Sequence, residues 1–178
     1  MEDLSGKPNE MTGAIVRQYG AALAMLQHGV EACPDSLWDA REDGAPVWRH
    51  AYHALWFLDG YLHKALGRTL APPSFHVAGA EGIAPPHPSP AFPRENIREY
   101  LEAVTARTLA IIREQGTEGL VRPAYFHWHG LTFLDTLIYN LRHVQHHVGQ
   151  INLVLRNTAG VSSEWIGFKE DPGPRKAP

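Results

Sequence analysis

The 178-residue sequence contains a single cysteine, Cys33, and this scarcity excludes an internal disulfide. A chain without disulfides is typical of a reducing compartment, so we expect a cytoplasmic protein. Cys33 stands directly before Pro34, at the expected end of a helix. We therefore interpret it as a structural or surface thiol and not as a nucleophile.

The sequence also lacks an excess of basic residues, because 16 Lys and Arg stand against 19 Asp and Glu, for a net charge of −3 with histidine neutral. The basic residues are scattered, which argues against nucleic acid as a partner. No apolar run approaches the roughly 20 residues of a membrane-spanning helix, and the first residues show no secretory signal. We expect a small-molecule substrate, with neither nucleic acid nor a membrane as partner.

Four segments do contain apolar residues at helical spacing. The predicted helices cover about 10–32, Pro46 to near Gly67, about 94–115, and a stretch from a cap at or near Thr132 to about Asn157. No strand pattern or internal repeat is present, so we predict an all-α fold, an antiparallel four-helix bundle. One domain is expected over 1–178, with its core at about 10–168 and loosely ordered termini.

A proline-rich stretch, residues 71–93, separates the second and third predicted helices. Its prolines, which include Pro72-Pro73 and Pro85-Pro86, prevent a regular helix or strand. We interpret the stretch as a long crossover on the surface of the bundle, with a substrate lid as the alternative. A long crossover lets the third helix start at the far end of the bundle, so a simple up-and-down order is not required.

The last predicted helix carries two histidines four residues apart, His143 and His147. Residues at this spacing lie on one helix face, so both rings can direct a nitrogen lone pair at one metal ion. Both lie at the edge of the apolar seam, whereas His146 points further outward. The alternative is a set of boundary histidines satisfied by water or carbonyl groups, but the paired spacing favours a metal site.

A third ligand is expected from the second predicted helix, which contains His50 and His53. Periodicity places both toward the same cavity and does not choose between them. The histidine-bearing face of the last helix also presents Thr136 and Asn140 but no carboxylate, which argues against a ferritin-like di-iron site. An all-nitrogen site suits Zn, Ni, Cu or Fe.

Two motifs resemble those of the DinB/YfiT-like superfamily, whose relatives include mycothiol-dependent maleylpyruvate isomerase and bacillithiol transferases. One is a histidine followed by an aromatic-rich segment, HALWFLDGY from His53; the other is HVQHHVGQ from His143. The resemblance implies a three-histidine four-helix bundle in which His53, His143 and His147 bind the metal. It therefore favours His53 over His50 as the third ligand.

The resemblance also implies a divalent-metal-dependent transferase or isomerase that uses a low-molecular-weight thiol as cosubstrate, with Zn, Ni or Fe as the metal. Three neutral imidazoles leave the charge of such an ion uncompensated, so a thiol that enters an open position would ionise. The alternatives are a metal-dependent hydrolase and a stress-associated metal-binding or dimerisation bundle without turnover. The amphipathic helices favour a homodimer. Further candidates for second-shell or substrate contacts are His50, Trp56, Tyr61, Asn140, His146 and Gln150.

Overall fold

The computed structural model describes residues 10–41, 44–86, 90–125 and 130–169. Within these ranges the chain has no strand, and it forms five helices: α1 (Glu10–Ala32), α2 (Asp35–Trp38), α3 (Val47–Ala65), α4 (Arg94–Leu120) and α5 (Phe133–Ala159). The predicted all-α class is confirmed. Among the described helices, none combines the length and the apolar character needed to cross a membrane. The predicted loose order of the termini concerns residues outside the described ranges.

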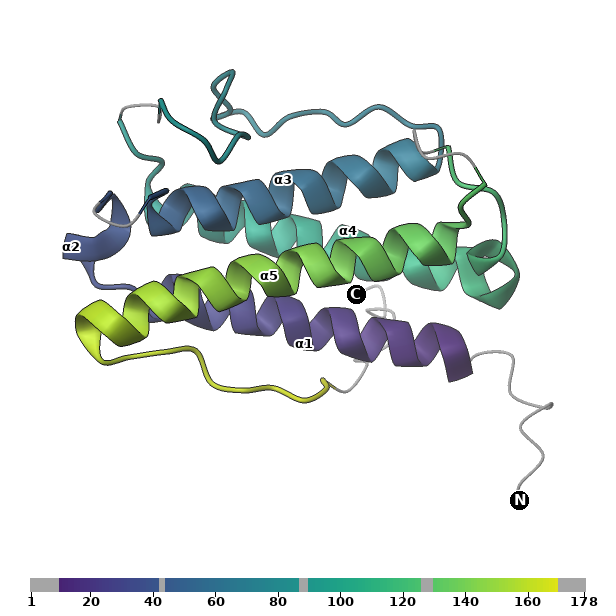
Figure 1. Cartoon of the computed structure of the whole chain (residues 1–178). Coiled ribbons are helices and arrows are strands. Elements are labelled where there is room, and N and C mark those ends of the chain that lie inside the picture. Colours follow the sequence, from purple (N-terminus) through teal and green to yellow (C-terminus); the bar gives the residue numbers. More distant parts are fainter. Residues whose placement is uncertain (1–9, 42–43, 87–89, 126–129, 170–178) are drawn as a thin grey trace, which may run out of the picture.

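The helices α3 and α4 run in the same direction (Figure 1). Near the start of both helices, the rings of Trp48 and Phe92 lie 5.0 Å apart. Further along, Asp59 on α3 accepts hydrogen bonds from Tyr100 and Arg107 on α4. Because a short turn cannot join two parallel helices, the connecting segment 66–93 returns along the outside of α3 (Figure 1). Its described residues contain no helix or strand.

The helices α1 and α5 are also parallel to each other, and they run opposite to α3 and α4 (Figure 1). Tyr19 on α1 donates a hydrogen bond of 2.6 Å to the carbonyl of Leu137, near the start of α5. Gly29, near the end of α1, approaches Ile151 near the end of α5. The four long helices thus surround one apolar core. Its largest apolar side chains include Tyr19, Leu23, Trp48, Tyr52, Leu55 and Phe133.

The helix α5, which carries both motif histidines, begins at the predicted cap. Thr132 Oγ1 accepts a hydrogen bond from the backbone N–H of Asp135, and the Asp135 carboxylate accepts one from the N–H of Thr132. This reciprocal pair is a capping box, and it fixes where the first turn starts. The helix ends at Gly160, whose φ of 69° lies in the left-handed region that glycine adopts without strain.

Two helix boundaries differ from the prediction. The helix α4 does not end at Gly116, although that residue has φ 57° and ψ −173° and interrupts the regular geometry; a further turn continues to Leu120. The short helix α2, which the sequence analysis did not predict, follows Pro34. Its Trp38 is buried and donates a 2.8 Å hydrogen bond to the carbonyl of Phe92, so a tertiary contact holds it in place.

Candidate metal centre

Two facing helices bring the three predicted ligands together. His53 comes from α3 and His143 and His147 come from α5, and one ring nitrogen of each lies within 4.8 Å of the others. The Nε2 atom of His143 is 3.2 Å from Nε2 of His53 and 3.2 Å from Nε2 of His147. Imidazoles bound tetrahedrally to one zinc ion, at about 2.0–2.1 Å, hold their nitrogens about 3.3 Å apart. The spacing of the three histidines fits a single ion of this kind.

The three rings are neutral at physiological pH. Burial, reinforced by the neighbouring imidazoles, lowers the pKa of His143 to about 4 and that of His147 to about 2. The pKa of His53 is also lowered, mainly by burial. A metal-binding histidine must be unprotonated, because its lone pair forms the bond to the ion. The cluster therefore presents three neutral imidazoles whose ring nitrogens can bind a metal ion.

The orientation of His53 is set by the main chain of the proline-rich segment. Its Nδ1 lies 2.6 Å from the carbonyl oxygen of Glu81. A carbonyl only accepts, so Nδ1 carries the proton and Nε2 directs its lone pair toward His143 and His147. A backbone acceptor in this position is the usual second-shell partner of a metal-binding histidine. Sequence reasoning did not find Glu81, because any residue type can supply a carbonyl.

His50, the other candidate on α3, contacts His147 on the side of its ring that faces away from His143. Its Nδ1 is 3.1 Å from Nδ1 of His147, the nitrogen opposite to the one that faces His143. If Nε2 of His147 offers its lone pair to the cluster, its Nδ1–H is the donor to His50. His50 is buried and forms part of the support of the cluster, whereas His53 points its nitrogen into it.

Three further candidates on α5 differ in their surroundings. His146 is exposed, and its ring contacts that of His147 edge to face at 5.2 Å. Asn140 is fully buried, and its Nδ2 donates a 3.4 Å hydrogen bond to the carbonyl of Leu58. The side-chain oxygens of Asn140 and Gln150 are buried and have no hydrogen-bond partner among the described residues. None of the three joins the group of converging nitrogens.

Aromatic rings line one side of the histidine cluster. The ring of Phe57 lies 4.6 Å from that of His53 and 5.9 Å from that of His143. Tyr139 stacks parallel to His143 at 6.4 Å, and Tyr61 packs between Phe57 and Tyr139 at 5.3 and 5.6 Å. Of these rings, Phe57 and Tyr61 lie in the aromatic-rich motif that follows His53, whereas Tyr139 was not among the predicted residues. Tyr139 could have been found from its position, one helical turn before His143.

The remaining candidate, Trp56, faces the proline-rich segment. Its ring stacks on His76 at 4.3 Å with an interplanar angle of 16°. The hydroxyl of Tyr52 lies 2.7 Å from Nδ1 of the same histidine. Trp56 therefore helps to attach the segment to α3 and also packs against the core.

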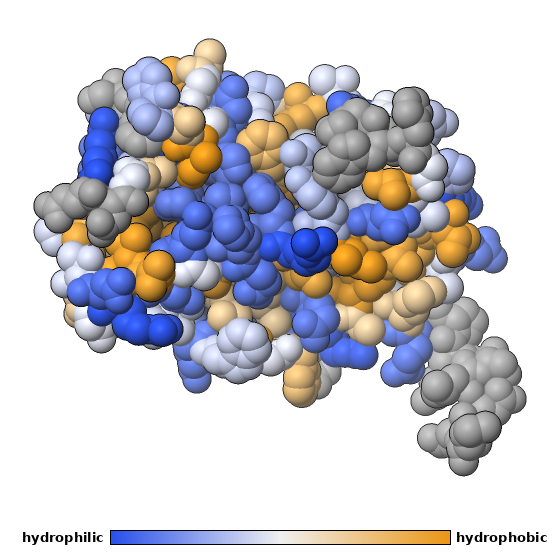
Figure 2. All heavy atoms as spheres, viewed as in Figure 1, coloured by the Kyte–Doolittle hydropathy of each residue, from blue (hydrophilic) through white to orange (hydrophobic). Residues whose placement is uncertain are grey.

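The surface over the cluster is mixed in character. Figure 2 shows hydrophilic side chains gathered over the middle of α3 and α5, beside a hydrophobic area over the first part of α5 and toward α1. The face formed by α3 and α5, the two helices that carry the three histidines, thus presents polar surface next to apolar surface.

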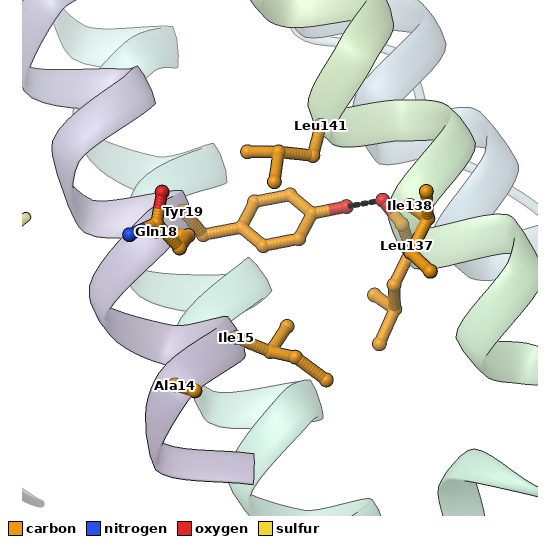
Figure 3. A pocket seen from close by; sticks show the side chains of 7 residues that line it. All are labelled: Ala14, Ile15, Gln18, Tyr19, Leu137, Ile138 and Leu141. Atoms are coloured by element: carbon orange, nitrogen blue, oxygen red, sulfur yellow. Dashed lines mark hydrogen bonds between the residues drawn. The ribbon is translucent and has the colours of Figure 1, made fainter. Parts of the chain in front are cut away.

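A separate apolar groove lies between α1 and α5 (Figure 3). Its volume is about 150 Å³, and Tyr19 reaches across it to the carbonyl of Leu137. Ligand pockets usually have volumes of about 300–1,000 Å³. The groove is lined by Ala14, Ile15, Gln18, Tyr19, Leu137, Ile138 and Leu141. It includes none of the three histidines, so it is not the chemical site.

The chain was compared with models of known protein families. The model of the DinB superfamily matches residues 18–151, which include His53, His143 and His147. Searches of curated proteins and of solved structures returned no match.

Proposed function

Because this chain belongs to the DinB superfamily, we propose that it is a divalent-metal-dependent transferase or isomerase that uses a low-molecular-weight thiol. The observation that carries the proposal is the convergence of three neutral imidazole nitrogens from α3 and α5. In this proposal His53, His143 and His147 hold a Zn, Ni or Fe ion. Three protein ligands are also the number that catalytic zinc sites use.

The charge of the donor set supports a thiol as cosubstrate. The cluster of converging groups contains three histidines and no carboxylate among the described residues. An ion held by neutral ligands keeps its full positive charge, and when bound it supplies Lewis acidity that favours a thiolate over a thiol. A thiolate is the nucleophilic form needed to attack an electrophilic carbon.

The surrounding residues have supporting roles in this proposal. The Glu81 carbonyl keeps the lone pair of His53 directed at the other histidines, and His50 does the same for His147. The rings of Phe57 and Tyr139 beside His143 form an apolar wall that excludes water on one side of the reacting groups. That wall suits an electrophile with an apolar carbon skeleton.

Several expectations from the sequence belong to the same proposal. We propose that the four long helices form one four-helix bundle domain, with the proline-rich segment as its crossover. We also propose that the protein is a cytoplasmic homodimer that acts on a small molecule. The α1–α5 face, with Ile138 and Leu153 exposed, supplies apolar surface of the kind a dimer contact uses.

The proposal is tested by metal content and activity of the untagged protein. Plasma mass spectrometry should find about one equivalent of Zn, Ni or Fe per chain. The double variant His143→Ala, His147→Ala should lose this metal, because it removes two of three donors. Wild type loaded with metal should then accelerate the reaction of a low-molecular-weight thiol with an electrophile.

The matched control is His146→Ala, which removes an exposed histidine of the same motif that lies outside the converging group. It should retain its metal. Absence of metal in wild type, with no uptake on reconstitution at neutral pH, would contradict the metal site. Bound metal without turnover of any thiol would favour the non-enzymatic alternative, and hydrolysis without a thiol would favour the hydrolase.

A further inference from the structure

Arg49 is a buried charged residue on α3, one helical turn before His53. Only 1% of its surface is exposed, and its guanidinium donates hydrogen bonds to backbone carbonyls of the proline-rich segment. Nε donates to Gly82, Nη2 to Gly79 at 3.0 Å, and Nη1 to Pro86 at 3.1 Å. Burial of a charge is costly unless hydrogen bonds compensate for it. The side chain therefore ties the described part of the segment to α3 through the carbonyls of Gly79, Gly82 and Pro86.

These anchor points flank the carbonyl that orients His53. Gly79 and Gly82 stand on either side of Glu81, whose carbonyl oxygen lies 2.6 Å from Nδ1 of His53. The Glu81 carboxylate accepts a 2.9 Å hydrogen bond from the N–H of Gly79, and the N–H of Gly82 donates to the Gly79 carbonyl at 3.3 Å. The result is a tight turn whose carbonyls are contacted by both the guanidinium of Arg49 and the imidazole of His53.

We propose that Arg49 is a positioning residue for the metal centre. By holding the carbonyls of Gly79 and Gly82, it fixes the Glu81 carbonyl against Nδ1–H of His53. This contact sets the tautomer of His53 and keeps its Nε2 lone pair directed at the cluster. The metal-binding part of the inference rests on the proposed function, but the tautomer is a property of the chain without metal.

The need for an arginine follows from the local structure. The described part of segment 66–93 has no helix or strand, so many of its carbonyls lack the partners that regular structure supplies. A guanidinium presents donors in a rigid fork and can bind several carbonyls at once, whereas a lysine ammonium is a flexible point charge. Arg49→Lys therefore keeps the charge and loses the geometry. This variant therefore distinguishes a positioning role of the Arg49 guanidinium from a general need for a positive charge at that position.

The first test uses the wild-type protein without metal. Long-range ¹H–¹⁵N spectra at neutral pH report which ring nitrogen of each histidine carries the proton, and His53→Gln assigns the relevant signals. We expect His53 to carry its proton on Nδ1. A proton on Nε2 would overturn the proposal whether or not the protein binds metal.

The second test uses Arg49→Lys and Gly79→Ala. The glycine has φ +88°, so a side chain there strains the turn from the segment side and leaves α3 unchanged. Both variants should lose the Nδ1–H preference of His53. Both should bind Zn²⁺ about 10- to 100-fold more weakly than wild type in a chelator competition, the usual effect of removing second-shell support. Exchange of backbone amides with deuterium should accelerate in residues 79–86.

The matched control is Arg94→Lys, because Arg94 on α4 also donates to a backbone carbonyl, that of Val30 at 2.8 Å, away from the cluster. It should leave the His53 tautomer and the Zn²⁺ affinity unchanged. Circular dichroism checks that each variant is helical. The proposal is overturned if folded Arg49→Lys and Gly79→Ala keep both the Nδ1–H form of His53 and wild-type affinity. If wild type binds no Zn²⁺, the proposed function fails, and the tautomer measurements alone decide the role of Arg49.

Discussion

The helix α3 carries two buried polar clusters, which face different partners and have opposite chemistry. Toward α5 it contributes His53 to the histidine cluster, a group of neutral nitrogen bases. Toward α4 it contributes Asp59, which is 1% exposed, to what we call the Asp59 cluster. There Arg107 donates to the carboxylate through Nε at 2.9 Å and Nη2 at 2.7 Å, and the hydroxyl of Tyr100 donates at 3.3 Å.

The difference between the clusters separates structural from functional polar groups. In the Asp59 cluster a negative charge meets a positive charge and further donors, so each group stabilises the others without a ligand. In the histidine cluster, three ring nitrogens lie close together without a carboxylate in the group, an arrangement that a cation stabilises. Burial of polar groups alone therefore does not identify a ligand-binding site. Such a site is identified by a cluster in which the charges, donors and acceptors of the protein do not balance one another.

The largest effect is expected from Arg107→Met, which breaks the Asp59 cluster. It leaves the buried Asp59 carboxylate with Tyr100 and His63 as its remaining polar contacts among the described residues. It should lower the free energy of unfolding by about 2 kcal/mol, because the Arg107 side chain is itself 39% exposed. Denaturant titration in the presence of a chelator measures this loss. Metal content, measured on the folded variant, should stay at the wild-type level.

The double variant His143→Ala, His147→Ala should instead lose its metal and keep most of its stability. With chelator present, it should lose less stability than Arg107→Met does, since relief of three crowded, desolvated imidazoles offsets part of the packing that it removes. If Arg107→Met loses metal, or the double histidine variant loses most of its stability, the two clusters are not separable.

Acidification should destabilise the metal-free protein through the histidine cluster. The folded-state pKa values of about 4 for His143 and about 2 for His147 lie below the unfolded value of about 6.5. Below pH 6.5 the unfolded chain therefore binds more protons, and stability falls as the pH falls toward 4. Above pH 6.5 this contribution is fully present and constant.

Denaturant titrations between pH 7.5 and 4.5 in the presence of a chelator would measure how steeply the free energy of unfolding falls with pH. The double variant His143→Ala, His147→Ala should show a shallower fall, by up to about 1.4 kcal/mol per pH unit for each histidine removed. Equal slopes for wild type and the double variant would show that these two histidines are not the groups being protonated.

The smallest effect is expected from His50, which contacts the far nitrogen of His147 at 3.1 Å. Replacement by alanine removes this partner and should weaken Zn²⁺ binding by about tenfold. Asparagine can place an oxygen near the position of Nδ1, so His50→Asn should recover much of the affinity. A complete loss of metal in His50→Ala would instead indicate that His50 is itself a ligand.

Much of the fold could be predicted because helices are defined locally. The apolar periodicity gave the bounds of α1, and the Thr132 cap and Gly160 mark the ends of α5. The pairing of His143 with His147 also follows from one helical turn. Between His50 and His53 the periodicity could not decide, because both lie on the same side of α3. Their roles differ because they contact different atoms on α5: His53 Nε2 lies beside Nε2 of His143, whereas His50 Nδ1 lies beside Nδ1 of His147.

Other features depended on contacts distant in sequence. Nothing in the pattern around Asp59 indicates that Arg107, on another helix, neutralises it. The parallel direction of α3 and α4 and the attachment of the proline-rich segment by Arg49 likewise join residues that are far apart along the chain.

The sequence by itself determined the helical class, the positions of the long helices and the residues able to offer nitrogen lone pairs, because each depends on neighbours within a few positions. The tertiary structure decided which ring nitrogens lie close enough together to bind one ion, through the packing of α3 against α5. It also decided which tautomer His53 adopts, through a backbone carbonyl that carries no sequence signal. Such a choice is made by three-dimensional proximity, and residue type alone does not specify it.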